Sequence, residues 1–173
     1  MSRAADVIRR LGLQPHPKEG GFFRETYRST ESIAADALPS RYRGVRQFCT
    51  AIYYLLTPTT FSALHRLRSD EIFHFYQGGP VRMIQLHPNG AAETIVLGPD
   101  LAAGHQLQVV VPRGVWQGSF LESGDYGLLG CTVAPAFDYA DYEHGDRTAL
   151  LAGYPAFTEW ITRLTNASSS SAV

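Results

Sequence analysis

The stretch HRLRSDEIFHFYQGG, residues His65 to Gly79, decides the fold because it contains two strand-like segments separated by a turn. Strand-forming residues fill EIFHFYQ (Glu71 to Gln77), and turn residues bound it at Arg68-Ser69-Asp70 and at Gly78-Gly79-Pro80. Within His65–Gly79, the histidines His65 and His74 and the acidic pair Asp70-Glu71 stand among apolar residues. Three interpretations follow: a metal site, a metal-free acid/base site, or polar residues that only hold the strands together.

Other short strands extend this pattern in both directions along the chain. We expect them at Gly20–Ser29, Phe48–Leu56, Phe61–Leu67, Val81–His87, Ala92–Gly98, His105–Pro112, Val115–Leu121 and Tyr126–Pro135. Many short strands between turn residues are typical of an all-β sandwich or barrel, and Pro88-Asn89-Gly90 predicts a hairpin. Short helices are expected at Asp6–Leu11 and Tyr154–Leu164. The prediction is one domain over residues 1–165, followed by a disordered Ser-rich tail at 166–173.

Composition limits the classes of partner. The 173 residues are 45% hydrophobic and 18% charged, and the formal net charge is −1, so we expect neither nucleic acid nor an anionic membrane as a partner. No segment approaches the roughly 20 apolar residues of a membrane span, and Met1–Leu13 lacks the apolar run of a signal peptide. We therefore expect a cytoplasmic protein in which Cys49 and Cys131 are free thiols.

The N-terminal strand GGFFRETYRS, residues 20–29, carries a polar face. Simple alternation places two sets of side chains on opposite faces: Phe23, Glu25 and Tyr27 on one, Arg24, Thr26 and Arg28 on the other. Arg24 and Arg28 are candidates to bind a carboxylate or phosphate of a substrate, and a solvated strand face is the alternative. Residues 30–46 are expected to form a loop that could cover a pocket.

Several motifs together resemble the cupin superfamily. PHPKEGGFFRETYRS (Pro15 to Ser29) and RSDEIFHFYQG (Arg68 to Gly78) resemble the PHPEGG-F-RETYRS and SDE-WHFY motifs of a family of small uncharacterised cupins, DUF985 or cupin_5-like. LGPDL, VPRGVWQG and CTVAPAFDYADYE follow, so the resemblance covers nearly the whole chain. It implies a double-stranded β-helix, the cupin jelly roll, with a short helix at each end, and a homodimer.

The general cupin pattern binds a divalent metal through three histidines and one glutamate. This sequence keeps His65 and Glu71 of that set, but Leu67 and Gln117 stand at the other two histidine positions. A set with only one imidazole is weak for zinc, iron or copper. No cofactor is therefore expected, and a divalent metal on His65, Glu71 and Gln117 is kept as an alternative.

Strand alternation predicts which side chains enter the barrel. If Glu71 points inward, Phe73 and Phe75 do so too, whereas His74 points outward. The predicted polar interior consists of His65, Glu71 and Gln117. The candidate substrate contacts are Tyr53, Phe73 and Phe75, for which plain core packing is the alternative. His16, between two prolines, is expected at the surface.

The preferred hypothesis is a metal-free enzyme of isomerase, epimerase or lyase type that abstracts a proton next to a carbonyl. His65 would be the base, Glu71 its orienting partner and Gln117 a donor to the developing enolate. In the acidic, aromatic stretch Asp138 to Tyr142, Tyr139 or Tyr142 could act as the general acid. A carbohydrate-like or polyketide-like small molecule would suit an aromatic barrel. The alternatives are a non-enzymatic ligand-binding protein and a metal-dependent oxygenase or isomerase with a reduced ligand set.

Overall fold

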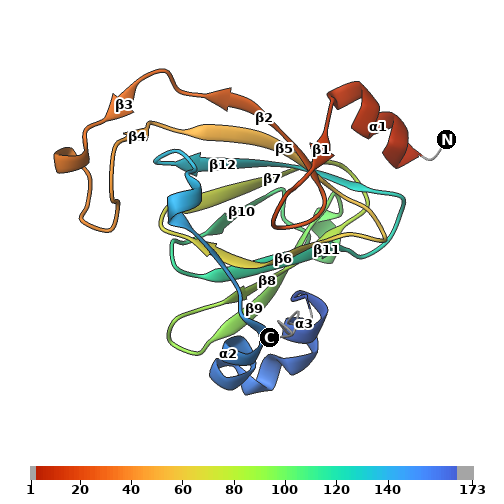
Figure 1. Ribbon diagram of the computed structural model, residues 1–173. Helices are drawn as coiled ribbons and strands as arrows, with labels where there is room; N and C mark the ends of the chain where they lie inside the picture. The colour runs from red at the N-terminus through yellow and green to blue at the C-terminus, as the bar shows by residue number, and fades with distance from the viewer. Residues whose placement is uncertain (1–2, 167–173) are drawn as a thin grey trace, which may run out of the picture.

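Two antiparallel β-sheets lie face to face in the computed structural model, which describes residues 3–166 (Figure 1). The first sheet has the order β1 (Gln14–Pro15), β2 (Phe22–Arg28), β5 (Thr50–Leu56), β12 (Gly127–Ala134), β7 (Asp70–Gly78) and β10 (Gln108–Val111). The second has the order β13 (Tyr142–His144), β6 (Phe61–Leu67), β11 (Trp116–Leu121), β8 (Val81–Leu86) and β9 (Ala92–Leu97). The predicted all-β jelly roll is confirmed. Apart from Asn166, the predicted tail at 166–173 lies outside the described residues.

Short helices cover the outer faces of both sheets. Helix α1 (Arg3–Leu11) packs on the first sheet, while α2 (Arg147–Gly153) and α3 (Thr158–Arg163) lie below the second (Figure 1). The remaining helical turns are η1 (Ala35–Ala37), η2 (Leu101–Ala103), η3 (Tyr139–Asp141) and η4 (Pro155–Phe157). The closing helix expected at Tyr154–Leu164 is thus η4 followed by α3, and α2 was not expected.

One β-hairpin lies within the second sheet, and another lies outside both large sheets. Strands β8 and β9 pair from Val81↔Leu97 to Leu86↔Ala92, and Gly90 takes a φ of 86° in their turn, which confirms the hairpin predicted at Pro88-Asn89-Gly90. The predicted loop at 30–46 contains a second, small hairpin of β3 (Ser32–Ile33) and β4 (Arg46–Gln47), which projects beside β2 and β5 (Figure 1). The buried Arg46 donates to Asp141 at 2.7 Å and so ties this hairpin to the body.

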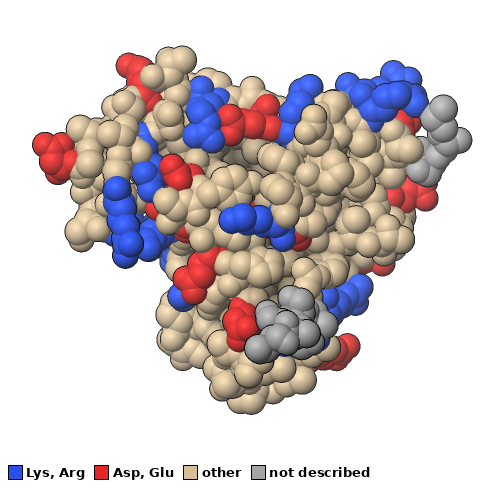
Figure 2. All heavy atoms as spheres, in the orientation of Figure 1, with Lys and Arg blue, Asp and Glu red and all other residues tan. Residues whose placement is uncertain are grey.

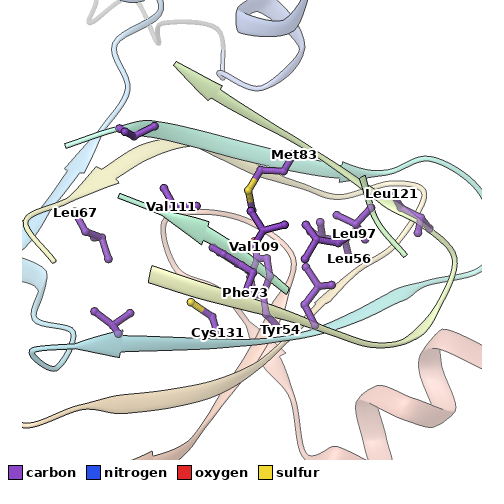
Figure 3. Close-up of a cluster of buried hydrophobic side chains, with 14 residues drawn as sticks. Tyr54, Leu56, Leu67, Phe73, Met83, Leu97, Val109, Val111, Leu121 and Cys131 are labelled. Carbon is purple, nitrogen blue, oxygen red and sulfur yellow. The ribbon is translucent and has the colours of Figure 1, made fainter. Parts of the chain in front are cut away.

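The main hydrophobic core fills the space between the sheets. Tyr54, Phe73 and Cys131 lie close together in it, with Met83 and Leu121 further along (Figure 3). A second cluster lies outside the second sheet, where Leu64, Trp116 and Phe120 pack against residues of α2 and α3. Because side chains alternate along a strand, β6 serves both clusters: Leu64 points to the helices and His65 into the barrel. Cys49 and Cys131 are both free thiols.

The alternation predicted for β2 is interrupted. Its pairing with β5 shifts register between Glu25 and Tyr27. A β-bulge adds one residue to a strand and so reverses the face of everything after it. Arg28 therefore lines the same cavity as Phe23 and Glu25, and the predicted grouping of Arg28 with Arg24 is wrong.

The surface carries charges of both signs. Figure 2 shows basic and acidic side chains dispersed over a face that is mostly uncharged, in keeping with the net charge of −1. Within residues 3–166, no helix is long and apolar enough to cross a membrane.

Candidate active site

A cavity of about 330 Å³ opens beside the first sheet, between its strands β2, β5, β7 and β12 and the segments 16–19 and 137–139. Its apolar walls come mainly from strands of the first sheet and include Phe23, Ile52, Tyr54, Phe73, Val133 and Phe137. Its polar lining includes His16, Glu19, Glu25, Arg28, Glu71 and Asp138. Aromatic walls with a few converging polar groups are typical of small-molecule sites. Residues 30–46 do not contribute to this lining, so the loop predicted to cover a pocket does not cover this one.

The three predicted interior residues meet through one amide. Gln117 on β11 donates from Nε2 to His65 Nε2 at 2.7 Å and to Glu71 Oε2 at 3.0 Å. His65 Nδ1 lies 2.7 Å from the carbonyl oxygen of Ala63, which can only accept, so the imidazole proton sits on Nδ1 and Nε2 carries the lone pair. Strand alternation therefore predicted this cluster correctly, and Gln117 is what joins the imidazole to the carboxylate.

Burial controls the charges in this cluster. His65 is 1% exposed and Gln117 is fully buried, and desolvation lowers the pKa of His65 and raises the pKa of Glu71. Glu71 accepts a second hydrogen bond, from the Cys131 thiol at 3.2 Å. Its closest approach to His65 is 3.9 Å, beyond a direct hydrogen bond. Glu71 lines the cavity, whereas His65 and Gln117 lie behind it.

An N-terminal loop adds two residues that the sequence reasoning missed. His16, expected at the surface, has a side chain that is only 5% exposed, and it lines the cavity beside Glu19. Glu19 Oε1 lies 3.6 Å from His65 Nε2 and 3.7 Å from His16 Nε2. Burial lowers the pKa of His16 to about 4 and raises the pKa of Glu19 to about 8, so both groups are neutral at pH 7. The motif PHPKEGG was the available signal.

The tyrosines after β12 also reach the site. The Tyr142 ring stacks on His65 with centroids 5.3 Å apart, and its hydroxyl is 2.9 Å from His144 Nδ1. Tyr139 lines the cavity and lies 4.8 Å from the Lys18 ammonium, measured to the ring centroid. Burial raises the pKa of both tyrosines, so both hydroxyls keep their protons at neutral pH.

The predicted substrate contacts fall in different places. Phe73 lines the cavity, whereas Phe75 packs against the main core and is not among the residues that line the cavity. Arg28 lines the cavity but makes a bidentate pair with Glu25 at 3.0 and 2.8 Å. Arg24 and Tyr53 lie elsewhere, with the guanidinium 5.7 Å from the ring centroid on the α1 side of the first sheet. The structure thus separates Arg24 and Tyr53 from the cavity.

The donor set does not fit the four-ligand cupin metal site. Leu67 is buried in the main core at one histidine position, and the Gln117 amide at another donates hydrogen bonds to both His65 and Glu71. Among residues 3–166, no group of three or more histidine, cysteine, aspartate or glutamate side chains is arranged to hold a metal ion.

Distant structures share the fold. The dTDP sugar isomerase from Desulfovibrio desulfuricans G20 is 14% identical, with a TM-score of 0.51, over 72% of this chain and 83% of that one. Oxalate decarboxylase from Bacillus subtilis is 14% identical with a TM-score of 0.53. That match covers 88% of this chain and 37% of the decarboxylase. The description of another structure of that enzyme names its Mn(II) centres.

Closer relatives match most of the chain. Protein SO0799 from Shewanella oneidensis is 36% identical with a TM-score of 0.85, over 96% of this chain and 99% of that one. A hypothetical protein from Leishmania major is 30% identical with a TM-score of 0.84, over 95% of this chain and 99% of that one. The uncharacterized protein YML079W of Saccharomyces cerevisiae is 34% identical over 72% of this chain and 67% of its own. The Cupin_5 pattern, described as cupin superfamily (DUF985), matches residues 5–145. The chain belongs to the Cupin_5 family of the cupin superfamily.

Proposed function

We propose that this cupin is a metal-free enzyme of isomerase, epimerase or lyase type that moves a proton next to a carbonyl group of a small molecule. The observation that carries the proposal is the placement of Glu71. Its carboxylate lines an aromatic cavity and is held by two donors, Gln117 and the Cys131 thiol. A carboxylate with a raised pKa in an apolar cavity is a stronger base than one in water.

The placement changes the roles expected from the sequence. Because Glu71 lines the cavity and His65 lies behind it, we assign the proton abstraction to Glu71. The neutral His65 holds Gln117 in place by accepting from its amide, and Gln117 in turn orients Glu71. In the forward step the carbon acid loses its proton to Glu71 Oε1 or Oε2, and the electron pair moves to the carbonyl oxygen to form an enolate.

The charges of the cavity favour an uncharged ligand. Arg28 is the arginine among the lining residues, and its guanidinium is already neutralised by Glu25. A phosphate or carboxylate would therefore meet Glu71, Asp138 and Glu25, and no lysine or second arginine is among the described residues that line the cavity. We infer a neutral hydroxylated carbonyl compound, carbohydrate-like or polyketide-like. The fold shared with a sugar isomerase makes this class plausible at the level of architecture only.

Hydrogen–deuterium exchange tests the proposal without knowledge of the product. The protein, dialysed against chelator, is incubated in D₂O with a panel of neutral ketoses, aldoses and 1,3-diketones, and deuterium uptake at carbon is followed by NMR. The wild type should catalyse uptake into at least one compound class, and Glu71→Gln should reduce the rate about 10²–10⁴-fold. Uptake that is equal in the two proteins would rule out Glu71 as the base.

A non-enzymatic binding protein is the second candidate. The observation that favours it is that both nitrogens of His65 and both oxygens of Glu71 already have hydrogen-bond partners within the protein. In that case a panel compound would stabilise the protein against heat and be recovered without deuterium. A homodimer and a cytosolic location belong to the proposal as well, and light scattering in solution checks the first of them.

A further inference from the structure

We propose that Glu19 is a second acid/base residue of the cavity, donating a proton to the ligand's carbonyl oxygen while Glu71 takes one from the adjacent carbon, and that His16 is its positioning residue. This inference rests on the proposed function and deepens it. It starts from a sequence motif that the predicted chemistry did not use, the loop from His16 to Gly21.

The two carboxyl groups have different surroundings. Burial raises the pKa of Glu71, but its two oxygens accept from Gln117 and Cys131, and these hydrogen bonds oppose that rise by favouring the ionised form. The Glu19 side chain is 12% exposed and lines the same cavity, and no described residue donates a hydrogen bond to its carboxyl group. Burial without a donor favours the protonated form, and the pKa of Glu19 is raised to about 8. Two carboxyl groups kept in opposite protonation states are a recurrent acid/base arrangement.

The loop is built to hold Glu19 at this place. The Glu19 carbonyl accepts from the Ala63 amide on β6 at 2.8 Å, and the Gly20 carbonyl accepts from the Tyr54 hydroxyl at 2.8 Å. Gly20 has a φ of 92°, and a Cβ there would collide with the carbonyl oxygen of Phe61. Only glycine combines this backbone conformation with so close an approach to β6.

His16 fixes the turn that carries Glu19. Its Nδ1 accepts from the Glu19 amide at 2.9 Å, so its own proton lies on Nε2, which faces Glu19 Oε1 at 3.7 Å. The His16 amide also donates to the Gly21 carbonyl at 3.0 Å, which closes the loop. The imidazole thus holds the backbone of Glu19 and lies beside its carboxyl group.

The two carboxyl groups together neither gain nor lose a proton in the forward step. In the forward step the substrate carbon gives its proton to the Glu71 carboxylate, and the Glu19 acid gives its proton to the carbonyl oxygen. The product is a neutral enol, with Glu71 protonated and Glu19 ionised. The reverse transfer, to the same or another carbon, restores both groups. An ionised Glu19 would face His65 Nε2 at 3.6 Å and could be stabilised there only if the imidazole takes up a proton.

The test is chemical labelling with dicyclohexylcarbodiimide, an apolar reagent that reacts with protonated carboxyl groups. Peptide mass spectrometry of the labelled protein should find the adduct on Glu19 at pH 7 and not on Glu71. Labelling should fall about tenfold for each pH unit above the pKa of about 8. Glu143, an exposed carboxylate paired with Arg66, is the internal reference that should stay unlabelled. Labelling of Glu71 in place of Glu19 at pH 7 would overturn the inference, as would labelling of neither.

Variants of His16 and Glu19 distinguish a positioning role of His16 from a general effect on the fold. His16→Asn keeps an acceptor for the Glu19 amide and should keep the labelling profile, whereas His16→Ala should shift the profile to lower pH. Glu19→Gln should retain the fold and lower deuterium exchange about 10²–10⁴-fold. Exchange that persists in Glu19→Gln overturns this inference and leaves the role of Glu71 intact. Absence of exchange in the wild type, with Glu19 labelled as expected, overturns the proposed enzymatic function instead.

Discussion

The two faces of strands β6 and β11 are built from adjacent residues but follow opposite physical rules. On the outer face, Leu64 and Trp116 pack with Ile161 and Leu164 into a hydrophobic cluster. On the inner face, the neighbouring His65 and Gln117 are just as buried but polar. Gln117 Oε1 has no hydrogen-bond partner among the described residues. The outer face stabilises the fold, whereas the inner face keeps buried polar groups at a cost in stability, which is typical of functional sites.

The largest effect should come from the inner face. Replacing His65 by Asn keeps a donor for the Ala63 carbonyl but removes the Nε2 acceptor that holds Gln117. We expect deuterium exchange to fall about 10²–10⁴-fold while the circular dichroism spectrum stays that of the wild type. Unchanged exchange in His65→Asn would remove His65 from the mechanism.

The matching change on the outer face should do the reverse. Leu164→Ala removes a fully buried side chain from the contact of α3 with β6, and it should lower the free energy of unfolding by about 2–5 kcal/mol. Denaturant unfolding measures this loss. The exchange rate per folded molecule should stay within twofold or so of the wild type, and a large drop would show that the two faces are coupled.

The cost of burying Glu19 should appear as a pH dependence of stability. Its pKa is about 8 in the folded protein against 4.5 for an ordinary glutamate, so the folded state holds this proton more tightly than the unfolded chain. Stability from Glu19 is thus full below pH 4.5 and is lost as the pH rises to 8. Because Gln does not titrate, Glu19→Gln should gain stability over the wild type in this window, by about 1.4 kcal/mol per unit of pKa shift at most. Thermal melts at pH 4.5 and pH 8 check this, and an equal difference at both pH values would contradict it.

The smallest effects should come from the two arginines of β2. Arg24 is remote from the cavity. Arg24→Ala should therefore change the activation free energy of exchange and the free energy of unfolding by no more than about 0.5 kcal/mol each. Arg28→Ala frees the Glu25 carboxylate at the cavity and should weaken binding of an uncharged compound by about 1 kcal/mol or less. Calorimetric titration of the two variants compares them. A larger effect from Arg24 would mean that the ligand binds on the α1 side.

Strand alternation explains why much of the site could be predicted. His65, Glu71 and Gln117 lie in regular strands, where a period of two fixes which side chains face the interior. The family resemblance supplied the jelly roll and the alignment of these strands with one another. Alternation failed for Arg28, because a bulge after Glu25 reverses the face, and no local signal in RETYRS marks the bulge.

The missed residues depend on contacts that are distant in sequence. His16 and Glu19 lie in a loop, and they reach the cavity because Ala63 and Tyr54, more than thirty residues away, hold the loop backbone. Loop residues have no periodicity from which an inward direction can be read. The pair of glycines after Glu19 was the usable signal, since adjacent glycines mark a close approach of the backbone to a neighbour.

The pH profile of deuterium exchange, measured on chelator-treated protein, tests the central claim most directly. An ionised Glu71 base and a protonated Glu19 acid predict a bell-shaped profile with its alkaline limb near pH 8. In Glu19→Gln the residual exchange should lose this alkaline limb and keep the acidic one. Exchange that disappears on chelation and returns with Mn²⁺, or that keeps rising through pH 8 in the wild type, would contradict a metal-free site built on two carboxyl groups.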